Sequence, residues 1–139
     1  MPHEFTYRRR VQFADTDAAG IVHFAMFYRY MEEAEHAMWR EAGLSIEPRD
    51  APIGWPRVAA SFEFHRPLRF EDECDVRIVV AAVKSRTIEY ACTITRNGEK
   101  IATGAMTIAC VRKAPGQPMQ STGIPEEIVR KLGGHEPTN

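Results

Sequence analysis

The stretch FAMFYRYMEEAEHAMWREAG, residues 24–43, decides the fold, because it is the one long helical pattern in the chain. Its apolar residues recur at intervals near 3.6, the period of an α-helix with one buried face. This apolar stripe consists of Phe24, Phe27, Tyr28, Met31, Ala34, Met38 and Ala42. Charged residues lie mostly opposite the stripe, and Gly43 is placed to end the helix. A stripe this wide has to be enclosed by other elements.

Five runs rich in β-branched and aromatic residues flank this helix, one before it and four after it. They cover residues 5–13, 58–64, 76–83, 87–95 and 101–111. Between the last two runs, Asn97-Gly98 is a strong signal for a two-residue hairpin. One strand, one helix and four strands do not make the alternating pattern of a parallel sheet. The sequence therefore predicts an α+β fold with an antiparallel five-stranded sheet curled around one long helix.

The remaining segments are short, and we expect a single domain over residues 1–139. Residues 44–57 hold three prolines and a glycine, which indicates an irregular segment and makes it a candidate lid. In the tail, residues 114–139, the run Pro125–Leu132 has acids first and bases last and predicts a short C-terminal helix.

Composition excludes several classes of function. The net charge of −1 gives no reason to expect nucleic acid, which requires a strongly basic face. No apolar run approaches the roughly 20 residues that cross a membrane, and the start of the sequence lacks the apolar core of a signal peptide. Cys74, Cys92 and Cys110 are far apart and are expected to be buried and reduced, so we expect a cytoplasmic protein. The cysteines and histidines lack the spacing of a zinc site.

An acidic motif, Asp15-Thr-Asp17-Ala-Ala-Gly20, lies between the first predicted strand and the long helix. A helix start offers unpaired backbone N–H groups, which stabilise a nearby carboxylate or developing negative charge. Asp15 and Asp17 could also simply cap a turn. An Asp-x-Asp pair also opens phosphatase-like haloacid dehalogenase sites, but those need a doubly wound domain that this chain is too short to form.

The residues Asp15-Thr-Asp-Ala-Ala-Gly-Ile-Val22 with the aromatic helix after them, and Arg66-Pro-Leu-Arg-Phe-Glu-Asp72, resemble hotdog-fold acyl-CoA thioesterases of the 4-hydroxybenzoyl-CoA thioesterase group. The resemblance runs from about residue 7 to residue 111. It implies a hotdog fold, Asp17 as the catalytic acid and Asp15 as a brace of the loop. It also implies that Lys84 and Arg86 contact the nucleotide end of coenzyme A, although both could equally be ordinary surface charges. It further implies assembly as a homodimer or homotetramer.

Three further features of this region leave alternatives open. His23 could orient water or a substrate oxygen, or be a buried histidine with satisfied nitrogens. Gly20 could provide a positive φ or allow close backbone approach. Glu33 and His36 have the spacing of a di-iron motif, but such sites need further acids, so Glu32, Glu33, Glu35 and His36 are expected to form a solvated face.

The combined prediction is hydrolysis of an acyl- or aryl-CoA thioester. Asp17 acts as nucleophile or general base, and backbone N–H groups near Phe24 and Ala25 form the oxyanion hole. Coenzyme A enters as part of the substrate, and no metal or other cofactor is expected. Two alternatives are a hotdog hydratase that uses His23 and a non-catalytic acyl-CoA binding module; the presence of Asp17 argues against the module. Trp55 and Phe62 either shape the acyl pocket or pack in the core.

Overall fold

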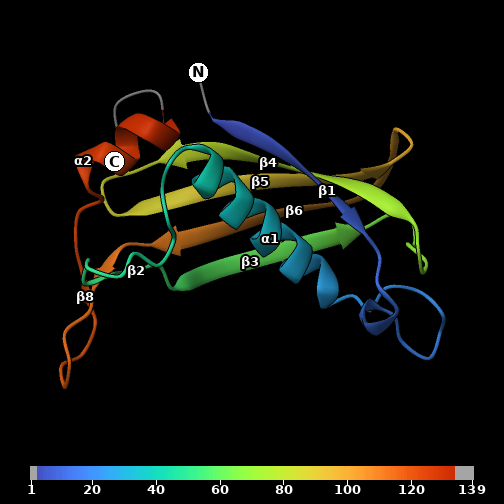
Figure 1. The fold of residues 1–139 in the computed structure, drawn as a ribbon, viewed down its shortest axis with the longest axis horizontal. Helices are drawn as coiled ribbons and strands as arrows, with labels where there is room; N and C mark the ends of the chain where they lie inside the picture. The colour runs from blue at the N-terminus through green and yellow to red at the C-terminus, as the bar shows by residue number, and fades with distance from the viewer. Residues whose placement is uncertain (1–2, 134–139) are drawn as a thin grey trace.

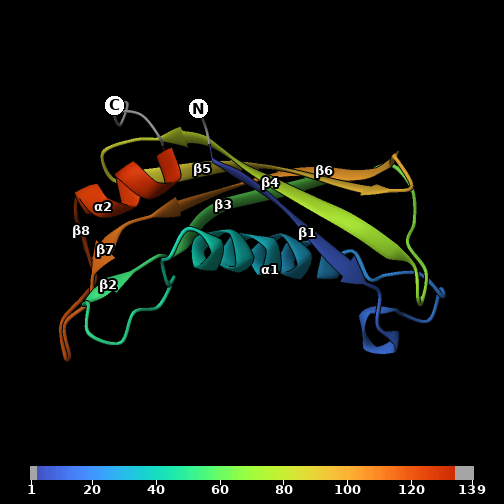
Figure 2. The same cartoon turned by 45° about the horizontal axis from the view of Figure 1, so that its top comes forward.

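A curved five-stranded antiparallel sheet covers helix α1 (Met26–Glu41) in this computed structural model, which describes residues 3–133 (Figure 1). The strands lie in the order β1 (Glu4–Arg10), β4 (Glu73–Val83), β5 (Thr87–Arg96), β6 (Glu99–Ala109) and β3 (Arg57–Phe64). Figure 2 shows α1 lying along one face of the sheet. The predicted α+β architecture is confirmed, and β1 and β3 are the edge strands.

Helix α1 is held by most of the apolar stripe that the sequence predicted, but Phe24 lies before the helix and is exposed. Phe27, Met31, Ala34 and Met38 are buried against the sheet. The helix begins at Met26 rather than Phe24, because residues 23–25 form a turn whose carbonyls accept the first helical N–H groups. At the other end, Gly43 has φ +79°, a left-handed conformation that ends the helix as predicted.

The predicted solvated face of α1 is wrong at one position. Glu35 is fully buried, because the guanidinium of Arg57 reaches it from β3 and compensates its charge. Glu33 is also engaged, through a bond from Arg9 of β1. Only part of this acidic face is therefore solvated.

The strands were predicted well, except for the C-terminal end of the first one. Asn97 and Gly98 have φ values of 50° and 79° in the β5–β6 connection, which fits the predicted hairpin. The three cysteines are free and buried, as expected. However, β1 ends at Arg10, and Phe13 begins a short 3₁₀ turn, η1 (Phe13–Asp15), with its side chain exposed.

A second, small sheet includes the end of the predicted lid segment, residues 44–57. It joins β2 (Ile53–Gly54), β7 (Val111–Arg112) and β8 (Gln120–Ser121). The segment 44–57 follows the end of α1, and Figure 1 shows it at the opposite end of the helix from η1. Trp55 is buried there against Trp39, with ring centroids 5.2 Å apart.

The C-terminal part of the described chain is helical, as predicted. Helix α2 (Glu126–Ile128) continues into a π-helical turn over Val129–Gly133, which buries Leu132. Among residues 3–133, no helix has the length and apolar character needed to cross a membrane.

Candidate active site

The loop of residues 15–23, called here the Asp17 loop, connects η1 to α1 and is closed by its own backbone. The N–H of Asp17 donates to the carbonyl of Ile21 at 3.0 Å, and the N–H of His23 donates to the carbonyl of Asp15 at 2.9 Å. Thr16 and Val22 form an isolated antiparallel bridge. Gly20 has φ +80°, and a Cβ at this position would meet open space. The positive φ is therefore confirmed, and close approach of a substrate to Gly20 stays a prediction.

A cavity of about 450 Å³ opens beside this loop. It is lined by Asp17, Ile21, Val22, Phe24, Phe27, Phe64, His65, Arg66 and Pro67. The exposed Asp17 carboxylate accepts the Ala19 N–H at 2.8 Å through Oδ1. No donor within residues 3–133 contacts its Oδ2, and Asp17 has no ion pair there. One carboxylate oxygen of Asp17 is therefore available to a ligand or to water.

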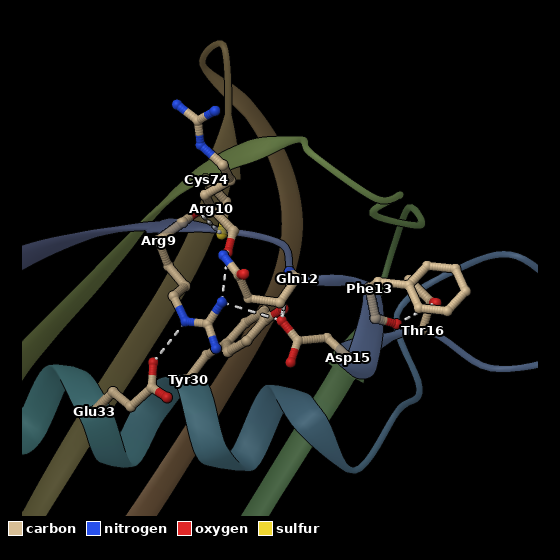
Figure 3. A network of polar contacts seen from close by, with 9 residues as sticks. All are labelled: Arg9, Arg10, Gln12, Phe13, Asp15, Thr16, Tyr30, Glu33 and Cys74. Atoms are coloured by element: carbon tan, nitrogen blue, oxygen red, sulfur yellow. Dashed lines mark hydrogen bonds and ion pairs between the residues drawn. The ribbon is translucent and has the colours of Figure 1, made fainter.

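Asp15, only two residues away, is in the opposite environment, buried beneath the loop (Figure 3). Its Oδ2 accepts the Tyr30 hydroxyl at 2.7 Å, the Gln12 N–H at 2.9 Å and Arg9 Nη1 at 3.1 Å. The bond from Gln12 caps turn η1, so the capping role expected for Asp15 is confirmed. All three bonds reach the same oxygen, and Asp15 is 5% exposed and does not line the cavity, so Asp17 and not Asp15 is presented to a ligand.

Arg9 connects this buried acid to helix α1. Its Nε donates to Glu33 at 2.8 Å, and its guanidinium carbon lies 4.8 Å from the centre of the Tyr30 ring. Burial alone would lower the pKa of Arg9, but Glu33 and Asp15 outweigh this effect and raise it. Burial, with the bond to Asp15, also raises the pKa of Tyr30, so its hydroxyl remains a hydrogen-bond donor.

The start of α1 presents the backbone groups considered for an oxyanion hole. The Ala25 N–H donates to Nδ1 of His23 at 3.1 Å, and the His23 ring stacks on Phe24 with centroids 4.7 Å apart. Within residues 3–133, no acceptor bonds the Phe24 N–H, whereas the Ala25 N–H becomes free only if the His23 ring turns away. His23 is exposed, so the alternative of a buried histidine is wrong. The catalytic roles of these three residues stay predictions.

The residues that line the cavity from the end of β3 were largely missed by sequence reasoning. Phe64 ends β3, and His65 and Arg66 follow it. Phe64 packs edge-on against Phe27 at 5.2 Å, while His65 Nε2 lies 3.3 Å from the Thr103 hydroxyl. The Arg66-Pro-Leu-Arg signature marked this segment, but its contact with the Asp17 loop depends on how distant strands pair. Of the two residues considered for the acyl pocket, Trp55 packs in the core and Phe62 packs against Phe27.

Lys84 and Arg86 are not brought to this cavity within one chain. The Val11 N–H donates to the carbonyl of Asp72, so the segment between β1 and the Asp17 loop lies beside the start of β4. Lys84 follows the other end of that strand, and 11 residues of extended chain span about 35 Å. Lys84 pairs with Glu89 at 2.7 Å, and Arg86 bonds Ser121 at 3.2 Å. Contact of these two residues with coenzyme A stays a prediction.

The acidic and sulfur side chains show no metal-binding arrangement in the part of the chain that the structure describes. No group of three His, Cys, Asp or Glu side chains within residues 3–133 is placed to hold an ion. The chemistry available at the cavity is that of a carboxylate, an imidazole, a guanidinium and backbone N–H groups.

Comparisons with known proteins agree with this fold. The family model described as "Thioesterase-like superfamily" matches residues 11–132. A 1,4-dihydroxy-2-naphthoyl-CoA hydrolase of Nostoc punctiforme is 26% identical over 92% of this chain and 86% of its own length. Among solved structures, a gentisyl-coenzyme A thioesterase is 30% identical with a TM-score of 0.82, over 92% of this chain and 99% of that one.

The fold is also shared with a 1,4-dihydroxy-2-naphthoyl-CoA thioesterase from Synechocystis, at a TM-score of 0.86 and 22% identity. That match covers 96% of this chain and 99% of the other. The family model spans the Asp17 loop, α1 and the sheet strands β3, β4, β5 and β6, while β1 lies before the matched residues. This chain therefore belongs to the Thioesterase-like superfamily and is a thioester hydrolase with the hotdog fold.

Proposed function

We propose that this protein hydrolyses the thioester bond of an acyl- or aryl-CoA in the cavity beside the Asp17 loop. The observation that carries the proposal is the exposed Asp17 carboxylate, which lines the cavity with one oxygen free at the start of a helix. A carboxylate in this position can act on a carbonyl group, while the helix start receives the negative charge that develops on the carbonyl oxygen.

The reaction can follow two routes with the same residues. In one, an Asp17 oxygen attacks the carbonyl carbon, the C–S bond breaks, the coenzyme A thiolate leaves, and water hydrolyses the resulting anhydride. In the other, Asp17 takes a proton from water, whose oxygen attacks the carbonyl carbon before the same thiolate leaves. In both routes the Phe24 N–H is the first candidate for the oxyanion donor, because it has no acceptor within residues 3–133.

The lining of the cavity favours an aromatic acyl group. Phe24, Phe27 and Phe64 supply aromatic surfaces, and aromatic rings pair through edge-to-face or offset contacts. Two of the similar proteins are named for aromatic CoA esters, which supports the same choice. His65 and Arg66 on the same wall can donate hydrogen bonds to substituents of the ring or to the coenzyme. Coenzyme A enters as part of the substrate, and we propose no other cofactor.

We also propose that the chain works as a homodimer or homotetramer in the cytoplasm. One side of the edge strand β3 has no strand partner within residues 3–133, and such an edge is available for pairing with another chain. A second subunit would also provide Lys84 and Arg86 from outside the chain that holds Asp17. The three free, buried cysteines support a reducing compartment.

The test is release of free thiol from a panel of aryl-, short-, medium- and long-chain acyl-CoA compounds, by the wild type and Asp17→Asn. We expect kcat/KM of the variant to fall by about 10²–10⁴, the usual contribution of a positioned acid–base group. Asp50→Asn, an exposed aspartate at the far end of α1, is the matched control and should retain activity.

Undiminished thiol release by Asp17→Asn would contradict the proposed mechanism. Binding of acyl-CoA without turnover in both proteins would point to a binding module. A change in the conjugation of the acyl chain without thiol release would point to a hydratase.

A further inference from the structure

Four side chains between β1 and α1 form a connected polar group, called here the Arg9 cluster: Arg9, Asp15, Tyr30 and Glu33 (Figure 3). Tyr30 is fully buried and Asp15 is 5% exposed. None of the four lines the cavity. The proposed reaction therefore uses none of them directly, although burying charged groups costs free energy unless they are well paired.

The cluster is attached to both arms of the Asp17 loop through the backbone of Asp15. The Asp15 carbonyl accepts the His23 N–H, and the next residue, Thr16, is bridged to Val22. Asp17 follows directly and bonds Ile21. Any shift of Asp15 is therefore passed to the segment that carries the reactive carboxylate and to the residue that precedes Phe24.

Tyr30 connects the same point to the helix. It lies in the second turn of α1, and its hydroxyl donates to Asp15 at 2.7 Å. The guanidinium of Arg9, from β1, lies over the Tyr30 ring. The Phe24 N–H precedes the start of α1, whereas the Asp17 carboxylate lies on the loop. The Tyr30–Asp15 bond ties these two parts together directly, and Arg9 adds an indirect link from Asp15 to Glu33 of α1.

We propose that Tyr30 and Arg9 are positioning residues, which act through Asp15 to hold the Asp17 carboxylate in place relative to the start of α1. This inference rests on the proposed function, because the reacting groups are those assigned there. A displacement of about 1 Å can cost up to 100-fold in rate, so a modest loosening of the loop has a measurable effect.

The experiment compares Tyr30→Phe with Tyr28→Phe on the same helix. The first removes only the hydroxyl that bonds Asp15, while Arg9 and Gln12 continue to satisfy that carboxylate. The second removes the hydroxyl of a half-buried tyrosine whose ring packs edge-on against Phe62. We expect kcat of Tyr30→Phe to fall by about tenfold with KM within about twofold, because positioning is lost and binding is kept. Tyr28→Phe should match the wild type in both constants.

A second measurement, amide hydrogen exchange of residues 16–24, does not depend on turnover. We expect faster exchange in this segment in Tyr30→Phe and not in Tyr28→Phe. A kcat of Tyr30→Phe equal to the wild type, an equal loss in both variants, or unchanged exchange of residues 16–24 would overturn the inference. Full activity of Asp17→Asn would instead remove the proposed function, and the exchange comparison would still test the cluster.

Discussion

Helix α1 meets two arginines that come from the two opposite edge strands of the sheet. Arg9 on β1 contacts Asp15 and Glu33, and Arg57 on β3 contacts Glu35 and Glu32. The second group, Arg57 with its two glutamates, is called here the Arg57 cluster. In both clusters an arginine compensates a buried carboxylate next to the same helix.

The two clusters differ in the structural element that carries the buried acid. Asp15 is part of the Asp17 loop, so the Arg9 cluster joins the helix to the segment beside the cavity. Glu35 and Glu32 both belong to α1, so the Arg57 cluster joins the helix to β3 and to no loop of the site. Comparable pairs of charges therefore have different expected consequences: the first should affect kcat, and the second should affect only the free energy of unfolding.

The largest expected effect on stability comes from Arg57→Met. The two nitrogens of the Arg57 guanidinium lie 3.1 Å and 2.5 Å from the two oxygens of Glu35, which is fully buried. Removing one member of a buried ion pair leaves the other uncompensated and costs about 3–5 kcal/mol. We expect urea unfolding to show a loss of this size, while kcat of the protein that remains folded stays within about twofold of the wild type.

Two controls accompany this variant. Arg57→Lys keeps the positive charge and should recover part of the lost stability, although it cannot make the same paired contact. Arg8→Met removes an exposed arginine that pairs with Glu73 and Asp75, and should change stability little. A large loss of kcat in Arg57→Met under folded conditions would break the distinction between the two clusters.

A smaller effect is expected in the pH dependence of stability. Burial raises the pKa of Glu35 above its ordinary value of 4.5, and Arg57 only partly opposes this. As the pH rises above 4.5, the unfolded chain releases this proton before the folded protein does, so the unfolded state is increasingly favoured. Stability contributed by protonated Glu35 is thus present at low pH and lost as the pH rises through the raised pKa.

The comparison to make is between the wild type and Glu35→Gln, whose amide does not titrate. The unfolding free energy of the wild type relative to the variant should fall between pH 4.5 and the raised pKa and then level off. A difference that stays constant with pH would show that Glu35 ionises normally in the folded protein.

Sequence patterns predicted the fold because the deciding signals are local. The 3.6-residue stripe specifies α1, the period-two alternation specifies β5, and Asn97-Gly98 specifies the turn between β5 and β6. Asp17 was also within reach of such reasoning, because the loop that carries it directly precedes α1 in the sequence and lines the same cavity as Phe24.

The errors arose where a residue's environment is set by a distant segment. Glu35 lies beside the apolar stripe, and Arg57, 22 residues later in the chain, compensates its charge where it is buried. His65 and Arg66 reach the cavity because β3 pairs with β6 and ends beside the Asp17 loop. The candidate lid, residues 44–57, contributes no residue to the cavity lining, and its Ile53 and Gly54 pair with β7 instead. None of these contacts has a periodic signature.

The smallest expected effects on stability and kcat come from the more exposed acid of each cluster, Glu33 and Glu32. Glu33→Gln keeps an oxygen that accepts the Arg9 Nε–H, and Arg9 keeps its contact with Asp15. The side chain of Glu33 is 27% exposed, and such partly exposed pairs contribute at most about 1 kcal/mol. We expect a loss of about 0.5 kcal/mol in urea unfolding and a decrease of kcat by no more than about twofold, since Asp15 is still held by Tyr30.

Glu32→Gln is the matched change in the Arg57 cluster, where Glu32 lies 3.3 Å from the guanidinium and is 45% exposed. It should lower stability by no more than Glu33→Gln does and leave kcat unchanged. If Glu33→Gln instead lowered kcat as strongly as Tyr30→Phe, the charge on Glu33 would be needed to keep Arg9 in place. The position of the Asp17 loop would then depend on the whole chain of contacts from Glu33 through Arg9 to Asp15, and not mainly on the hydroxyl of Tyr30.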